Sequence, residues 1–95
     1  MHTHPHLRDV AVFYKALGNE RRLFILEILG RKNRTETELV SYLGIHPSAV
    51  SKHLSLLVRA GIVQGNRIGR EVEFRLTPGM KTQDVIKIFH LLTKR

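Results

Sequence analysis

The chain has 95 residues, and its 16 Lys and Arg against 8 Asp and Glu give a formal net charge of +8. A chain of this length forms one small domain with a single modest core. It contains no Cys, which excludes disulfide bonds and thiolate metal sites and favours an intracellular setting. The positive charge suits a polyanionic partner such as nucleic acid or an acidic membrane, although a basic protein without such a partner has the same composition.

Unbroken apolar runs such as Leu23 to Leu26 cover only a few residues, far short of the ~20 residues that cross a bilayer. We therefore expect a cytoplasmic protein with no membrane partner. Residues 1–7, which carry His2, His4 and His6 around a proline, are predicted to form a flexible tail. This tail could bind a transition-metal ion, but a solvated tail is the preferred interpretation. The domain is expected to span residues 8–95.

Two helices are predicted in the first third of the chain. Val10, Phe13 and Leu17 recur at offsets of three and four, which indicates an amphipathic helix from Leu7 to Leu17 that ends at Gly18. Asn19 is a suitable N-cap for a second helix, from Glu20 to about Leu29, which is apolar on most sides and so belongs in the centre of the fold. A basic loop is expected over residues 30–34.

The next two predicted helices form a helix-turn-helix. Thr35 and Glu38 have the spacing of a capping box, which starts a short helix that runs to Tyr42 or Leu43. Gly44 can adopt the left-handed conformation that ends it, and Pro47 suits the first turn of the following helix, at about residues 47–60. Two helices joined by a short turn with a glycine are typical of this motif.

The second helix of the motif has two different faces. At 100° per residue, one face carries small hydroxyls and cations, while Val50, Leu54, Leu57 and Val58 gather on the other. The polar set comprises Ser48, Ser51, Lys52, Ser55 and Arg59. Small hydroxyls allow close approach to base edges or phosphates and cations supply charge, so the face is predicted to bind DNA. The alternative is an ordinary solvated face, which more often carries Glu and Lys pairs.

A β-hairpin, or wing, is predicted at about residues 62–76, because apolar and polar residues alternate there, with Ile68 and Gly69 as the turn and Gly69 at a position that needs positive φ. Arg67 and Arg70 flank its tip and are candidate DNA contacts; a structural hairpin with solvated Arg side chains is the alternative. A last helix is expected from Thr82 to about Lys94, with Val85, Ile88, Phe89 and Leu92 on one apolar face. That face is wider than one small core requires, so pairing with a second copy through the first and last helices is predicted.

This order of elements resembles the ArsR/SmtB family of bacterial and archaeal winged-helix repressors. The segment from Ala16 to Leu26 resembles the family's "ALAnptRlrIL" segment, Ser48 to Leu54 resembles its recognition helix, and Ala60 to Leu76 resembles its wing. The fold class predicted is accordingly mainly α with a β-hairpin wing, a winged helix-turn-helix.

The resemblance implies a homodimer that holds two recognition helices in successive major grooves of a pseudo-palindromic operator on double-stranded DNA. Family members usually repress transcription, and an inducer lowers their affinity for DNA. By position, Ser48, Ser51, Lys52 and His53 match the helix contacts of the family, and Arg67 and Arg70 match those of the wing. Pro47 departs from the pattern, since many members have a Gln there. His53 lies at the edge of the apolar face, so a packing role is an equal alternative.

The inducer is not predicted by the sequence. Sensing through thiols is excluded by the absence of Cys, and Asp84 and His90 lie on different faces of the last helix, so no metal site and no cofactor are predicted. No phosphate loop, Cys nucleophile or convincing pair of carboxylates indicates an enzyme. The alternative function is a winged-helix module for protein–protein contact without specific DNA binding.

Overall fold

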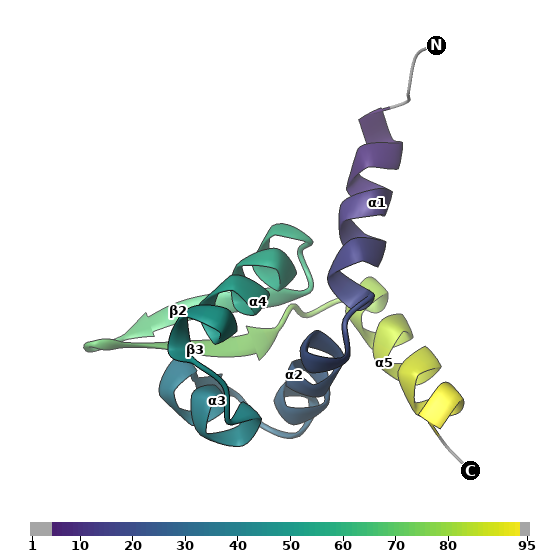
Figure 1. Ribbon diagram of the computed structural model, residues 1–95. Helices are drawn as coiled ribbons and strands as arrows, with labels where there is room; N and C mark the ends of the chain where they lie inside the picture. Colours follow the sequence, from purple (N-terminus) through teal and green to yellow (C-terminus); the bar gives the residue numbers. More distant parts are fainter. Residues whose placement is uncertain (1–4, 94–95) are drawn as a thin grey trace.

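A computed structural model describes residues 5–93, with the side chains of residues 5, 80–82, 85, 88, 89 and 93 left out of the description. The elements are α1 (Pro5–Leu17), α2 (Glu20–Arg31), β1 (Arg34–Thr35), α3 (Glu36–Leu43), α4 (Pro47–Arg59), β2 (Val63–Ile68), β3 (Glu71–Leu76) and α5 (Met80–Thr93). Helices α2, α3 and α4 surround the core, the hairpin of β2 and β3 extends to one side, and α1 and α5 lie on the other (Figure 1). The predicted winged helix-turn-helix fold is confirmed.

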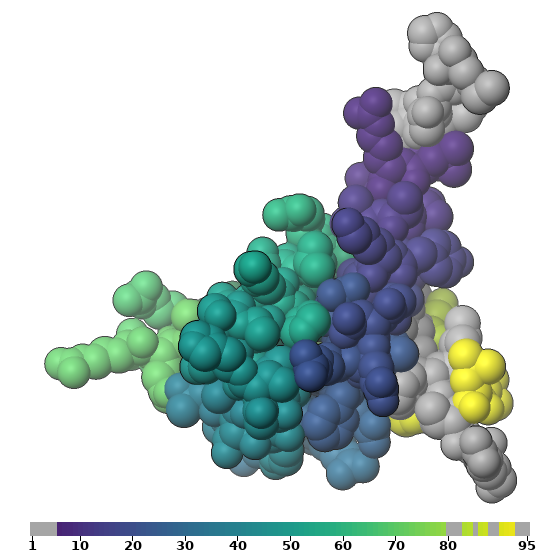
Figure 2. All heavy atoms as spheres, viewed as in Figure 1, coloured from purple at the N-terminus to yellow at the C-terminus, as the bar shows by residue number. Residues whose placement is uncertain are grey.

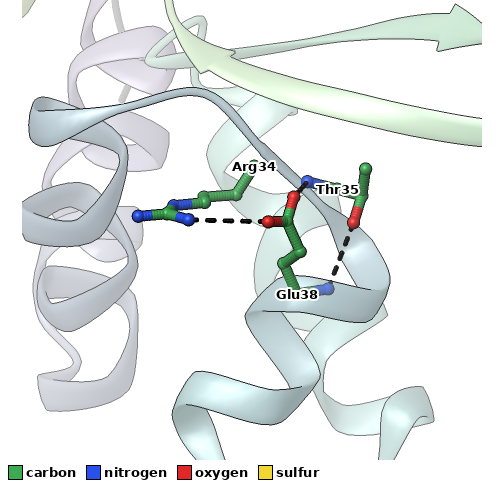
Figure 3. A network of polar contacts seen from close by, with 3 residues as sticks. All are labelled: Arg34, Thr35 and Glu38. Atoms are coloured by element: carbon green, nitrogen blue, oxygen red, sulfur yellow. Dashed lines mark hydrogen bonds and ion pairs between the residues drawn. The ribbon is translucent and has the colours of Figure 1, made fainter.

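Local sequence signals account for the helix ends. The Asn19 side chain accepts hydrogen bonds from the amides of Arg21 and Arg22 at the start of α2. At the start of α3, the Glu38 amide donates to Thr35 Oγ1 at 3.1 Å and the Thr35 amide donates to Glu38 Oε1 at 2.9 Å, as Figure 3 shows. These bonds form the predicted capping box, and the bond from the Thr35 amide is the main cause that lowers the pKa of the Glu38 carboxyl. Arg34 adds an ion pair to Glu38 at 3.5 Å.

The turn between α3 and α4 also follows the prediction. Gly44 has φ 65°, in the left-handed region, and its amide donates to the Val40 carbonyl. Pro47 occupies the first turn of α4, where the helix has no intrahelical acceptor for a backbone amide. The helix-turn-helix is therefore specified by contacts between residues a few positions apart.

The three strands form an antiparallel sheet in the order β1-β3-β2. Val63 pairs with Leu76 and Ile68 pairs with Glu71, which leaves Gly69 and Arg70 as a two-residue turn. The turn thus lies one residue later than the sequence analysis placed it, although Gly69 has the expected positive φ, 62°. Strand β1 was not predicted: Arg34 and Thr35, assigned to a loop and a cap, pair with Phe74 and Glu73.

Helix boundaries differ from the predictions by a few residues. Helix α1 begins at Pro5, two residues before the predicted start at Leu7, so His6, which the sequence analysis assigned to the tail, is helical; proline is tolerated in a first turn. Helix α2 continues to Arg31, and α5 begins at Met80. His2, His4 and Lys94 lie outside the described residues.

The core is aliphatic and lies where α2, α3, α4 and the base of the hairpin meet. Its fully buried side chains are Ile25, Leu26, Leu39, Val50, Leu54, Leu57, Ile62 and Val63. With Ile28 and Leu29, which are 6% and 4% exposed, helix α2 supplies more buried residues than any other element, as expected for the central helix, but its Phe24 is 41% exposed. Because α4 packs its apolar residues into this core, its opposite face is fixed outward.

Candidate nucleic-acid interface

Helix α4 presents a polar face that is separated cleanly from the core. Val50, Leu54 and Leu57 are at most 2% exposed, whereas Ser48, Ser51, Lys52, Ser55 and Arg59 are all exposed. The prediction for Val58 is wrong: it is 43% exposed, because it follows Leu57 by 100° around the helix, beyond the edge of the core-facing stripe. The outward face therefore combines three hydroxyls, two cations and backbone that a partner can approach closely. We call these five exposed polar residues the α4 face.

His46 extends the α4 face at its N-terminal end, and the sequence analysis did not single it out. It is the N-cap of α4, and its exposed ring lies against Ser48: Nδ1 is 3.1 Å from the Ser48 amide and 2.8 Å from Ser48 Oγ. A histidine directly before a helix-starting proline was the available signal, because an imidazole nitrogen can accept the same bond as an Asn or Asp cap.

His53 has the packing role that was the alternative in the sequence analysis. It is partly buried, and its Nδ1 lies 3.2 Å from Arg22 Nη1. Arginine is only a donor, so Nδ1 accepts and the imidazole is neutral. Burial, followed by the positive charges of Arg22 and Arg21, lowers the pKa of His53. Because Nδ1 is engaged by Arg22, the predicted contact of His53 with DNA would have to be made by Nε2, and it stays a prediction.

Arg22 joins α1, α2 and α4 in one contact network. It is only 8% exposed, and it donates from Nε to the Ala16 carbonyl at 2.7 Å and from Nη2 to the Lys15 carbonyl at 2.8 Å. These are carbonyls of the last turn of α1, which lack partners inside the helix. The guanidinium thus fixes the end of α1 against the helix that carries the α4 face.

The hairpin of β2 and β3 projects beyond α4 (Figure 2). Arg67 and Arg70 are both exposed, and Arg70 lies in the turn itself. Between hairpin and helix, a shallow depression is lined by Glu36, Ser51, Leu54, Ser55, Val58 and Phe74. The α4 face and the hairpin therefore form one continuous surface with cations on both parts.

The predicted dimer residues fall into three groups. Val10 and Leu92 are 43% and 81% exposed, while Phe13 and Leu17 pack partly against the core of their own chain. The side chains of Val85, Ile88 and Phe89 lie outside the description. The first half of α1 extends away from the rest of the molecule (Figure 1). Leu7 in that half and Tyr14 in the second half are 46% and 67% exposed.

The described residues contain neither a cluster of metal ligands nor a helix suited to a membrane. Within the described residues, no group of three or more His, Asp or Glu side chains is arranged to hold a metal ion. Among the helices of the described part of the chain, none has the length and apolarity needed to cross a membrane.

Comparison with known proteins identifies the family. Residues 19–64 match the model of the bacterial regulatory proteins of the arsR family. The transcriptional activator HlyU of Vibrio cholerae is 36% identical over 81 residues, which span 85% of this chain and 74% of that protein. The chain belongs to the ArsR family. ArsR proteins are transcriptional regulators and not enzymes, which agrees with the lack of catalytic groups in the sequence.

Other relatives of this ArsR chain carry different regulatory names. A probable mercury resistance operon repressor of Streptomyces lividans is 39% identical over 72 residues, covering 76% of this chain but only 56% of that protein. The chain therefore spans little more than half the length of that relative.

Solved structures agree with the family assignment. The structure of HlyU from Vibrio cholerae matches with a TM-score of 0.83 at 31% identity, covering 98% of this chain and 100% of that one. The homodimeric winged helix-turn-helix DNA-binding domain of Mb0332 from Mycobacterium bovis matches with a TM-score of 0.81 at 28% identity, covering 90% and 79%.

Proposed function

We propose that the protein is a dimeric, sequence-specific regulator of transcription that binds double-stranded DNA and represses its target. The observation that carries the proposal is the α4 face, whose small and cationic residues are exposed while the other side of the same helix is buried. In a helix-turn-helix protein, the second helix enters the major groove, and its N-terminal residues contact base edges. Ser48, Ser51, Lys52 and Ser55 are the proposed contacts of α4, together with the outer nitrogen of His53.

The hairpin supplies the second part of the proposed interface. Arg67 and Arg70 at its projecting end are placed to reach the phosphates or the minor groove beside the site occupied by α4. The net charge of +8 favours DNA at long range in addition to these contacts. Glu71, exposed beside the turn, and Glu73 further along β3 restrict the proposed contact to the tip.

The proposed dimer places two such surfaces on one operator. Exposed apolar residues on the projecting half of α1 and at the end of α5 support an interface there, and the similar Mb0332 domain is a homodimer. A two-fold dimer would present two α4 helices to half-sites about one helical turn apart on a pseudo-palindrome.

Fluorescence anisotropy across a salt series tests the proposal. The protein would be titrated with an operator selected from a randomised duplex pool and with a scrambled duplex. If about six to ten phosphates are contacted, affinity for the operator should fall ~10³- to 10⁵-fold between 50 and 200 mM salt. Weak binding that ignores both sequence and salt would contradict the proposal and favour a protein-contact module. A promoter–reporter assay then distinguishes repression from activation.

Substitutions locate the interface. Lys52→Ala and Arg70→Ala should each weaken operator binding, whereas Lys87→Ala is the matched control, because Lys87 is also an exposed cation but lies on α5, away from α4 and the hairpin (Figure 1). If only Lys87→Ala lost affinity for the operator, the DNA-binding surface would have to lie elsewhere on the molecule.

A further inference from the structure

The ring of His46 has one nitrogen fixed by the helix cap and the other available to a partner. A backbone amide can only donate, so the 3.1 Å contact with the Ser48 amide makes Nδ1 of His46 an acceptor. The neutral ring then carries its proton on Nε2, because the bond made by one nitrogen sets the tautomer of the other. Within residues 5–93, no hydrogen bond engages Nε2 of His46.

The position of this donor is fixed as well as its chemistry. The ring is held against the first turn of α4 by two contacts with Ser48, at 3.1 Å and 2.8 Å, and Pro47 restricts the backbone between them. A donor held in this way loses little conformational entropy on binding. Since Ser48 belongs to the α4 face, the Nε2–H group lies at the N-terminal edge of that face.

We propose that His46 is a specificity-determining residue that donates a hydrogen bond from Nε2–H to the N7 of a guanine in the major groove. The inference rests on the proposed DNA-binding function. Guanine presents two acceptors there, N7 and O6, whereas thymine presents one, O4, beside its methyl group, adenine presents a donor beside its N7, and cytosine presents a donor. A neutral group that only donates therefore meets no opposing donor on guanine. The discrimination comes from the tautomer that the helix cap imposes.

The test compares the protein with His46→Asn on modified DNA. Asparagine keeps an N-cap acceptor, and its NH2 donors, on a shorter side chain, end short of the position of the imidazole Nε2–H. Each guanine of the selected operator would be replaced in turn by 7-deazaguanine, which lacks the N7 acceptor. Wild-type affinity should fall about three- to tenfold at one guanine, the range expected for one hydrogen bond, and His46→Asn should be insensitive at that position alone. Ser41→Asn, an exposed change on α3, is the control and should retain the wild-type profile.

The outcomes separate this inference from the proposed function. If the wild type and His46→Asn bind the operator with salt-dependent preference and identical 7-deazaguanine profiles, the inference is wrong and the DNA-binding function stands. A second series replaces single phosphates of the operator by methylphosphonates and tests for a phosphate acceptor. If a methylphosphonate weakens binding of the wild type but not of His46→Asn, while no 7-deazaguanine separates the two proteins, the guanine contact is also overturned. If neither protein prefers the operator, the proposed function itself fails. Matching circular dichroism spectra of the two proteins confirm that the cap and fold are retained.

Discussion

Replacement of Arg22 by Met should destabilise the protein, because the buried guanidinium connects α1, α2 and α4. Methionine has a similar length but makes none of the three hydrogen bonds of the guanidinium, to the carbonyls of Ala16 and Lys15 and to His53 Nδ1. Bonds from a charged donor contribute roughly 1.5 to 3 kcal/mol each and a weaker bond about 0.5 to 1. Relief from burying the charge offsets part of this sum, so we expect a net loss of about 2 to 3 kcal/mol.

Urea unfolding at pH 7.5, at one fixed protein concentration because the protein is proposed to be a dimer, measures this loss. Arg22→Lys is the matched variant: it keeps the charge but cannot place separate donors toward two carbonyls and a ring nitrogen, so it should lose most of the same stability. A double-mutant cycle with His53→Ala isolates the contact with α4, for which a coupling of at least about 0.5 kcal/mol is expected. A loss below about 1 kcal/mol for Arg22→Met would refute the reasoning.

Three further predictions concern pH, assembly and the wing. The lowered pKa of His53 means that the unfolded chain binds a proton that the folded one resists, so stability should fall as pH drops below about 6.5; in His53→Gln, denaturation across pH 5 to 8 should show a smaller fall, and an unchanged pH dependence would count against the Arg22 contact. Leu92→Glu, at a site 81% exposed, should give monomers in sedimentation and weaken operator binding together; a surviving dimer would place the interface elsewhere. Gly69→Ala, at φ 62°, should cost roughly 1 kcal/mol in thermal unfolding, whereas no loss would mean that the turn readily adopts another conformation.

The parts of the fold that sequence predicted well depend on short-range contacts. The capping box of Thr35 and Glu38, the left-handed Gly44 and the helix-starting Pro47 each act within a few residues, so the residue types themselves specify the geometry. The polar side of α4 was predicted for a related reason: helical periodicity fixes the direction of each side chain once the buried side is known.

Strand β1 could not be predicted by the same means. Two residues show no alternation, and the pairing of Arg34 with Phe74 joins positions 40 residues apart. The strand exists because the edge of β3 offers unpaired backbone groups beside the start of α3, which is a property of the assembled fold. The exposure of Val58 could not be predicted for a similar reason. Helical periodicity places it next to the buried side of α4, and only the packed structure shows that the buried side ends before Val58.

His46, the N-cap of α4, and His53, inside that helix, differ in how far the sequence predicts their contacts. His46 and His53 both use Nδ1 as an acceptor, but the donor is a backbone amide two residues away in one case and the guanidinium of Arg22, 31 residues away, in the other. The first donor is implied by the position before Pro47, whereas the second follows only from the packing of α2 on α4. Because the hydrogen bond at one ring nitrogen decides which nitrogen holds the proton, the partner of Nδ1 sets what each ring can do. His46, the N-cap of α4, offers its Nε2 at the edge of the α4 face, and His53 secures that helix to α1 and α2 through Arg22.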